Sequence, residues 1–240
     1  MEKRDELYKG KAKTVYATDN PRRLIMHYRD DVSAFDGAKL AKLDLKGETN
    51  NKINAYVMGK LAAAGVPTHF LHVLNERESL VKAMKMIPVE CVVRNVCAGS
   101  MAKRYGLPEG QRLAEPIFEF FLKSDALHDP LCNDDHIRVL GWASAAEIAE
   151  MKALTHRVNA VLQPMFAEAG IDLVDYKLEF GHLVEDPQGP LVLGDEFTPD
   201  GCRLWDVKSG EKLDKDRFRR DLGQVIDRYR EVATRIGAPL

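Results

Sequence analysis

The sequence predicts an α+β fold of two lobes, with antiparallel sheets and flanking helices. Three patterns support this prediction. Short β-prone runs separated by turns fill the first 45 residues, two long amphipathic helical patterns lie in the second half, and an alternating strand follows the first of these helices. We place the boundary between a strand-rich lobe, residues 1–87, and a mixed lobe, residues 88–240, near Pro88, which interrupts the apolar runs.

In the first lobe, turn sequences mark the ends of the strands. Asp-Asn-Pro and Asp-Gly turns follow the β-prone runs KTVYATD and RRLIMHYRDDVSAFDG. A helix is predicted over residues 47–64, because Ile53, Val57 and Leu61 recur at helical spacing and Gly65 then stops the pattern. Further strands are expected in VPTHFLHVLN and in SLVKAMKMIPVECVVRN.

The second lobe contains the two long helical patterns. Ser144 and Glu147 form the capping box S-x-x-E, and apolar residues follow at helical spacing. Pro164 is expected to kink the last turns of this helix. A second helix is predicted over residues 216–236, with Leu222 in its apolar stripe. Between the helices we expect a β-hairpin of VDYKLEFG and PLVLGDEF, joined by HLVEDPQG.

The composition excludes several classes of partner. The chain of 240 residues has a formal net charge of −2, which argues against an extended nucleic-acid surface and an anionic membrane partner. No apolar run reaches the ~18 residues of a membrane-spanning helix, and the first residues, MEKRDELYKGKAK, lack the apolar segment of a signal peptide. The four cysteines are scattered without a CxxC pair. We therefore expect a cytoplasmic protein.

The strand VDYKLEFG carries three charges. Because successive side chains point to opposite faces of a strand, Asp175, Lys177 and Glu179 share one face, and the other face is wholly apolar. One interpretation is that these charges simply face water, as in an ordinary half-buried strand. The other depends on LGDEFTPDGCRLWD, in which Asp195 ends the strand that would pair with this one and can lie beside Glu179.

Two neighbouring carboxylates repel each other unless a cation separates them. Magnesium binds through one or two carboxylates together with the phosphates of a nucleotide. On this interpretation Glu179 and Asp195 hold a magnesium nucleotide, Lys177 faces the group that is transferred, and Asp175 meets the second substrate.

A lysine-rich turn, YKGKAKTVY, offers a second candidate site. Lys9, Lys11 and Lys13 alternate, so they share one side of an extended segment, and Gly10 lets the backbone approach a ligand closely. A polyphosphate suits this arrangement, and a solvated lysine face is the plainer interpretation. The chain has no GxxxxGK[ST] sequence, which excludes a Walker A loop. The turn is similar instead to the nucleotide-covering loops of two-lobed kinase-like and ATP-grasp enzymes.

Other polar side chains border small-residue turns and loops. In VVRNVCAGSMAKRYGLPEG, Arg94 and Ser100 flank a turn that opens a helix, where a guanidinium fork suits a phosphate or a carboxylate. Arg203 follows the Pro-Asp-Gly turn and returns toward the end of the hairpin. The alternative is an exposed basic helix start. Lys123 and Asp129 border a proline-bounded loop, which is either solvated or recognises a metal or an amine.

These stretches together resemble a known family. The stretches YKGKAKTVY, SAFDG, VECVVRNVCAGSMAKRYGLPEG, FFLKSDALHDPLCNDD, VDYKLEFG and LGDEFTPDGCRLWD occur in the order typical of SAICAR synthetases, over nearly the whole chain. The resemblance implies an ATP-grasp-like fold, a homodimer and a ligase of purine biosynthesis. Such a ligase joins 5-amino-1-(5-phospho-D-ribosyl)imidazole-4-carboxylate (CAIR) to L-aspartate, with ATP as co-substrate and Mg²⁺ as cofactor. ATP converts the carboxylate to an acyl phosphate, and the aspartate amine displaces phosphate.

The resemblance also implies roles for residues around the nucleotide. The phosphates of ATP would be held by Lys11, Lys13 and the backbone of Ala12. The adenine pocket would be lined by Val15, Leu24, Val81, Lys82 and Met86, with the backbone of residues 82–86 reading the edge of the base. Glu179 and Asp195 would bind Mg²⁺ and the nucleotide.

For the acceptor substrates, the resemblance implies a phosphate clamp for CAIR made of Arg94, Ser100 and Arg203. Lys177 and Asp175 would act as catalytic residues at the imidazole carboxylate and the amine, and Lys177 would offset charge in the transition state. Lys123 and Asp129 would position ATP or aspartate.

Two other functions stay open from the sequence. A small-molecule kinase would share the nucleotide site but would transfer phosphate without any need for aspartate. A nucleotide sensor would bind without turnover, although such a sensor needs no charge such as Lys177 at a reacting centre. Phosphate release from Mg-ATP and CAIR, with and without L-aspartate, separates the three functions.

Overall fold

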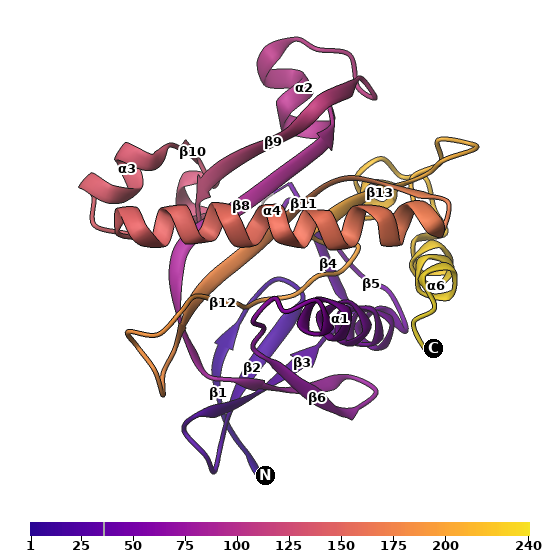
Figure 1. Cartoon of the computed structure of the whole chain (residues 1–240). Helices are drawn as coiled ribbons and strands as arrows, with labels where there is room; N and C mark the ends of the chain where they lie inside the picture. Colours follow the sequence, from indigo (N-terminus) through magenta and orange to yellow (C-terminus); the bar gives the residue numbers. More distant parts are fainter. Residues whose placement is uncertain (36) are drawn as a thin grey trace.

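The computed structural model describes residues 1–35 and 37–240, and Asp36, in the stretch SAFDG, lies outside the described residues. Two antiparallel sheets with helices packed against them form most of the molecule (Figure 1). The sheet of the first lobe lies at the bottom of this view, and the sheet of the second lobe lies above it. This arrangement confirms the predicted α+β fold.

The first lobe is built on a five-stranded sheet in the order β1-β2-β3-β7-β6. Its strands are β1 (Lys3–Lys9), β2 (Lys13–Thr18), β3 (Arg23–Tyr28), β6 (Phe70–Asn75) and β7 (Glu78–Lys82). A hairpin of β4 (Asp31–Ala34) and β5 (Lys39–Lys42) follows β3, and helix α1 (Lys46–Ala63) packs against β3, β6 and β7. The strands and the helix expected in this part of the chain are present.

The second lobe is built on a six-stranded sheet, in which β10-β9-β8-β11-β12 are consecutive neighbours and β13 also pairs with β11. Its strands are β8 (Met84–Val96), β9 (Arg112–Leu122), β10 (Leu131–Cys132), β11 (Ile171–Leu183), β12 (Val192–Leu193) and β13 (Cys202–Asp206). Helix α4 (Ala145–Glu168) crosses one face of this sheet and packs on β8 and β11 (Figure 1).

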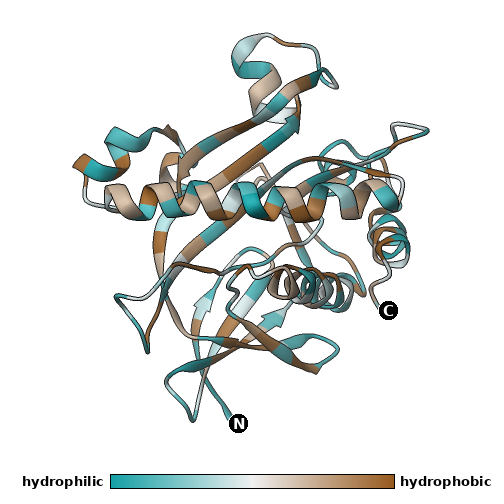
Figure 2. Ribbon diagram, viewed as in Figure 1, coloured by the Kyte–Doolittle hydropathy of each residue, from teal (hydrophilic) through white to brown (hydrophobic). Residues whose placement is uncertain are grey.

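Burial of apolar side chains explains why α4 lies on this sheet. Met151 and Leu162 of α4 share one core with Val93 of β8 and Phe180 of β11. In Figure 2 apolar residues run along β8 and β9, whereas polar residues dominate helix α2 (Gly99–Tyr105). Removing this apolar surface from water is the main force that holds the second lobe together.

The helix ends follow the capping signals of the sequence. Ser144 Oγ accepts a hydrogen bond from the Glu147 N–H (3.2 Å), and Glu147 Oε2 accepts one from the Ser144 N–H (2.6 Å), so the predicted capping box is confirmed. A second capping box opens helix α3 (Asp134–Val139). Helix α4 contains Pro164 and continues past it, and the kink expected there stays a prediction.

The closing segment differs from its prediction. The single helix expected over residues 216–236 is wrong, because the chain forms helix α5 (Asp216–Arg219) and helix α6 (Val225–Ile236) with a break between them. Gly223 and Gln224 adopt positive φ angles of 67° and 52° in this break, which a helix cannot contain. Leu222 is consequently 46% exposed and does not join an apolar stripe.

The predicted hairpin is confirmed, and a loop separates the two strands, β12 and β13, that pair with β11. Strand β12 pairs with β11 through Phe180 and Leu193, whereas β13 pairs with the earlier part of β11, from Ile171 to Tyr176. Between these two stretches, Gly194 N–H donates to Glu179 O (2.9 Å) and Lys177 N–H donates to Gly201 O (3.1 Å). The loop of residues 194–201 therefore leaves and rejoins β11 beside its central charged residues.

The boundary predicted near residue 87 falls within a strand. Strand β8 runs for 13 residues through Met86 and Pro88 and pairs with β9 and β11. Its pairing with β11 is irregular where Pro88 lies, between the pairs Gly181–Met86 and Glu179–Glu90. The division into two lobes at residue 87 stays a prediction. No helix within the described residues has the length and apolar character needed to cross a bilayer.

Candidate active site

Three adjoining cavities form a cleft between the two sheets. An apolar cavity of about 280 Å³ lies against the first lobe. It shares four lining residues with a central cavity of about 370 Å³: Tyr8, Lys13, Lys123 and Asp195. The central cavity in turn adjoins an arginine cavity of about 420 Å³, with which it shares several residues, among them Lys11, Glu90, Asp129, Lys177, Asp200 and Lys215.

The pairing of the first sheet builds the apolar cavity. Val15 of β2 pairs with Met26 of β3, and Leu24 of β3 pairs with Val81 of β7, so their side chains meet on one face. The five residues assigned to an adenine pocket all line this cavity: Val15, Leu24, Val81, Lys82 and Met86.

The charges of β11 do not face water. Asp175 and Glu179 are only 3% and 2% exposed, which excludes the interpretation as an ordinary solvated strand face. Lys177 Nζ lies 2.7 Å from Glu90 Oε1, 3.0 Å from Glu179 Oε1 and 3.8 Å from Asp195 Oδ2. Burial alone would lower the pKa of Lys177, but these carboxylates raise it well above its ordinary value. Lys177 therefore stays protonated.

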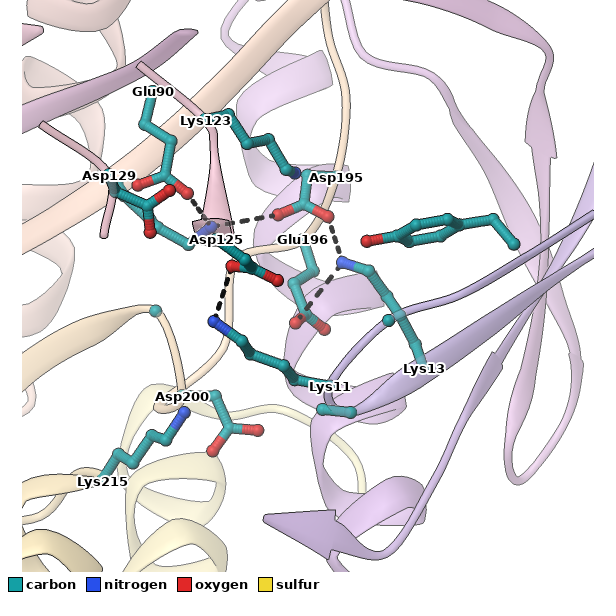
Figure 3. Close-up of a pocket in the computed structure, with 15 residues that line it drawn as sticks. Lys11, Lys13, Glu90, Lys123, Asp125, Asp129, Asp195, Glu196, Asp200 and Lys215 are labelled. Carbon is teal, nitrogen blue, oxygen red and sulfur yellow. Dashed lines mark hydrogen bonds and ion pairs between the residues drawn. The ribbon is translucent and has the colours of Figure 1, made fainter. Parts of the chain in front are cut away.

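Two more lysines neutralise the same carboxylates. Lys13 forms ion pairs with Asp195 and with Glu196 Oε1, the latter at 3.4 Å (Figure 3). Lys123 forms an ion pair with Glu179. Burial would raise the pKa of Asp195, but Lys13, Lys177 and Lys123 together hold it well below its ordinary range. Asp195 and Glu179 thus share the ammonium of Lys177, and the Mg²⁺ expected between them stays a prediction.

The backbone brings Asp195 into this position. Strand β12 ends at Leu193, two residues earlier than expected, and Asp195 follows in the left-handed region with φ of 55°. A non-glycine residue in this region is held there at a cost of about 1 kcal/mol or more. The surrounding pairing of residues 194–201 with β11 supplies that restraint.

The arginine cavity joins the predicted phosphate clamp to Asp175. On β11, Asp175 pairs with Arg94 of β8 on one side and with Arg203 of β13 on the other. Its Oδ2 accepts hydrogen bonds from Arg94 Nη1 (3.0 Å) and Arg203 Nη1 (2.8 Å). Arg94 also donates to Glu119 Oε2 (2.6 Å) and to Ser100 Oγ (3.1 Å). Asp175 is therefore bound to the arginines and has no ion pair with Lys177.

The lysine-rich turn contributes two of its three lysines to the cleft. Lys11 and Lys13 line the central cavity together with Ala12, and Lys11 Nζ lies 2.8 Å from Asp125 Oδ1. Lys9, which the alternating pattern groups with them, is an exposed residue of β1 and lines none of the three cavities. Gly10 N–H donates to Lys13 O (2.9 Å), and this tight turn separates Lys9 from the others.

The loop before β10 places the remaining predicted residues. Lys123 lines the apolar and central cavities, and Asp129 lines the central and arginine cavities. Asp129 Oδ1 accepts a hydrogen bond from Ser124 N–H (2.8 Å), and its φ is 46°. The carboxylate of Asp129 therefore also closes its own loop.

Sequence reasoning missed several carboxylates of the central cavity, among them Glu90, Asp125 and Glu196. Glu90 lies opposite Glu179 on β8, and only the pairing of the two strands reveals this. Glu196 lines the central cavity, and its Oε2 is buried without a hydrogen-bond partner. Burial raises the pKa of Glu196. The Asp-Glu pair that follows the hairpin strand could have indicated Glu196 as a site residue.

Asp200 and Lys215 were missed as well. Asp200 Oδ2 lies 2.5 Å from Lys46 Nζ and accepts a hydrogen bond from Asn50 Nδ2 (2.8 Å), and Oδ1 accepts one from Tyr229 Oη (2.9 Å). Burial would raise the pKa of Asp200, but Lys46 and Lys215 lower it to about 2. The sequence had suggested only a turn at Pro-Asp-Gly, and no pattern pointed to Lys215.

Comparison with known proteins identifies the family. The SAICAR synthetase family profile matches residues 6–236. The chain is 61% identical to phosphoribosylaminoimidazole-succinocarboxamide synthase of Alteromonas mediterranea over 240 residues, which is 100% of both chains. It is 59% identical to the synthase of the same name from Nitrosococcus oceani over 238 residues, which is 99% of this chain and 98% of the other.

Solved structures agree with this match. The crystal structure of phosphoribosylaminoimidazole-succinocarboxamide synthase from Ehrlichia chaffeensis superposes with a TM-score of 0.96 at 44% identity, covering 98% of this chain and 100% of that one. A SAICAR synthetase in complex with ADP gives a TM-score of 0.93 at 44% identity, covering 98% of each chain. The chain therefore belongs to the SAICAR synthetase family, the ATP-dependent ligases that join CAIR to aspartate in purine biosynthesis.

Proposed function

We propose that ATP and CAIR lie end to end along the cleft and that each of the three cavities binds one part of them. ATP places its base in the apolar cavity and its phosphates in the central cavity, and CAIR places its phosphate in the arginine cavity. The observation that carries this assignment is the position of Lys177. It lines both the central and the arginine cavity and meets three carboxylates, so it lies where a phosphoryl donor and its acceptor have to meet.

The base end of this assignment rests on apolar surface. Val15, Leu24, Val81 and Met86 offer flat contacts for a purine, and the backbone of residues 82–86 lies at the cavity, where its N–H and C=O groups read the edge of the base. A relative with 44% identity over 98% of this chain binds ADP, which supports a nucleotide here.

The phosphates follow in the central cavity, with Lys11, Lys13 and the backbone of Ala12 around them. Glu179 and Asp195 would hold Mg²⁺, and their donor set fits this ion. Both supply hard oxygens beside one another, and the neighbouring Glu196 has a buried oxygen without a partner. Among the described residues no three His, Cys, Asp or Glu side chains form a metal cluster, so oxygens from phosphate and water would complete the coordination. When bound, Mg²⁺ would neutralise part of the negative charge of the phosphates.

The ligation follows from this geometry. A carboxylate oxygen of CAIR attacks the γ-phosphorus of ATP and ADP leaves, which gives an acyl phosphate. The amine of aspartate then attacks the carbonyl carbon, phosphate leaves with its bridging oxygen, and the amine loses a proton. Lys177 is fixed by Glu90 and Glu179 and stays charged, so it stabilises the negative charge that develops on the transferred group.

The CAIR phosphate would meet a clamp that is already assembled. Arg94 is only 3% exposed, and Glu119, Asp175 and Ser100 bind it on three sides. It therefore orients the other residues of the clamp and has little surface left for the ligand. The side chain of Arg203 is 18% exposed and offers its free face to the phosphate. Lys123 and Asp129 would position ATP or aspartate from the loop before β10.

Phosphate release tests the proposal. Purified protein is given Mg-ATP and CAIR, with or without L-aspartate, and we expect release only when aspartate is present. ADP formation without aspartate, with the phosphoryl group retained on the acceptor, would indicate a small-molecule kinase, and the absence of both ADP and phosphate would indicate a nucleotide sensor. The homodimer, the cytoplasmic location and the ATP-grasp-like assignment stay predictions.

A further inference from the structure

One cation that lines the central and arginine cavities has no ion pair within the described residues. Of the lysines and arginines that line the central and arginine cavities, seven have an ion pair with a described carboxylate: Lys11, Lys13, Arg94, Lys123, Lys177, Arg203 and Arg219. Lys215 lines both cavities, and within the described part of the chain its ammonium makes neither an ion pair nor a hydrogen bond.

The nearest carboxylate is already occupied. Lys215 lies beside Asp200 (Figure 3), but both oxygens of Asp200 are taken by Lys46, Asn50 and Tyr229. Burial lowers the pKa of Lys215 to about 8, with Lys46 and Arg219 adding repulsion. Lys215 is half-buried, and an ammonium that has lost part of its water without gaining an ion pair favours an incoming anion.

The backbone holds Lys215 in this position. Its N–H donates to Pro199 O (3.1 Å), next to Asp200. Asp214, just before it, accepts hydrogen bonds from Leu204 N–H (2.8 Å) and Asp216 N–H (2.7 Å). The side chain is therefore aimed by a fixed loop and is not a solvated surface lysine.

We propose that Lys215 binds a carboxylate of L-aspartate, an inference that rests on the proposed function. The phosphates of ATP and of CAIR already have cationic groups in the central and arginine cavities, whereas the cation considered so far for the dicarboxylate substrate, Lys123, is paired with Glu179. Lys215 lines the same two cavities as Lys177, so a carboxylate held there would leave the amine free to reach the acyl carbon at Lys177. The same chemistry would also suit the phosphate of CAIR, and the test separates these two sources.

The test is steady-state kinetics of Lys215→Met, which keeps the aliphatic stem and removes the charge. We expect the KM for L-aspartate to rise about tenfold or more, while the KM values for CAIR and ATP change less than about threefold and Lys215→Arg recovers much of the loss. Lys212→Met is the matched control, because Lys212 lies over the Trp205 ring at 3.2 Å and lines none of the three cavities.

Two amides of aspartate give a second measurement that a purely structural role would not change. L-asparagine and aspartic acid α-amide each lack one carboxylate, and the wild-type enzyme should disfavour both. The ratio of kcat/KM for aspartate to kcat/KM for an amide measures this penalty. In Lys215→Met the ratio should be smaller for the amide that lacks the carboxylate bound by Lys215. If neither penalty shrinks, or if the KM for CAIR rises in place of the KM for aspartate, the inference is wrong. A wild-type enzyme without aspartate-dependent phosphate release would instead overturn the proposed function.

Discussion

The two charged ends of the cleft are built on different chemistry. At the arginine end, Arg94 and Arg203 share Asp175, and Glu119 and Asp216 take up further N–H groups. At the lysine end, Lys13, Lys123 and Lys177 meet Glu90, Glu179, Asp195 and Glu196. A guanidinium makes several directed hydrogen bonds, whereas an ammonium is a compact charge on a flexible stem.

This difference indicates which of the two ends can rearrange when substrates bind. The arginines are held in one orientation before any substrate arrives, as suits a clamp for a group that does not react. On the proposed function, we expect the lysines to exchange a carboxylate for a phosphate, while a metal ion takes over the carboxylate that is released. We therefore expect substitutions at the lysine end to change turnover and those at the arginine end to change binding or stability.

The largest effect is expected for Lys177→Ala. Removing this charge should lower kcat by about 10³-fold, because an interaction made mainly in the transition state is lost. Nucleotide affinity, measured by calorimetry with ADP, should change less than about fivefold. Equal turnover in this variant would remove Lys177 from the reaction.

Asp195→Asn tests whether the lysine end holds the metal. We expect kcat/KM for Mg-ATP to fall about 100-fold and the Mg²⁺ concentration needed for half activity to rise. Chelation should abolish activity in the wild type, with recovery on adding Mg²⁺. Asp172→Asn is the control, because Asp172 lies on β11, the strand that also carries Glu179, and pairs with exposed Arg112 outside the three cavities. An unchanged Mg²⁺ requirement in Asp195→Asn would contradict the assignment.

Arg203→Lys and Arg94→Lys sharpen the contrast within the arginine end. Arg203→Lys should raise the KM for CAIR about tenfold, since a point charge replaces a planar fork. Arg94→Lys should chiefly lower the free energy of unfolding, by about 3 kcal/mol, because Glu119 and Asp175 lose a buried partner. Urea denaturation measures the second effect. If both variants had the same effect on CAIR and on stability, the two arginines would not have separate roles.

The smallest effect is a pH dependence carried by Lys215. Its pKa is about 8 in the free protein, in the field of Asp200, Glu196, Lys46 and Arg219. The ammonium binds an anion only when protonated, so kcat/KM for aspartate should fall as pH rises through 8, by up to about tenfold at pH 9.

Lys215→Arg provides the reference for that profile. Arginine stays charged, so dividing the wild-type profile by the variant profile removes the titration of the aspartate amine itself. A ratio that stays flat between pH 7 and about pH 9 would show that Lys215 does not titrate at this site.

Local patterns predicted part of this site. The alternation of VDYKLEFG placed Asp175, Lys177 and Glu179 on one face, and the family stretches named most of the lining residues. Local patterns could not show that Asp175 and Lys177, two residues apart, have different partners, because those partners come from β8, β13 and the loop of residues 194–201.

The missed residues have the same explanation. Glu90 enters the site through strand pairing over 89 residues of sequence separation from Glu179, which local periodicity cannot reveal. Lys215 enters as the residue that precedes α5, where its N–H donates to Pro199 O, a contact that periodicity does not show. Further on, Gly223 and Gln224 break the expected closing helix. Apolar periodicity alone continued through that break, so the sequence predicted one helix.

Strand β8 carries Met86 at the apolar cavity, Glu90 at the central cavity and Arg94 at the arginine cavity. From Glu90 to Arg94 the pairing with β11 is regular, and four residues of strand span roughly 13 Å, so on the proposed function we expect the rise per residue to set the spacing between the reacting group and the ribotide phosphate. A single inserted residue would shift that spacing and turn the following side chains to the opposite face. Since Met86, Glu90 and Arg94 lie on one continuous strand, we expect any adjustment to the length of the bound substrates to come from the loops around β8.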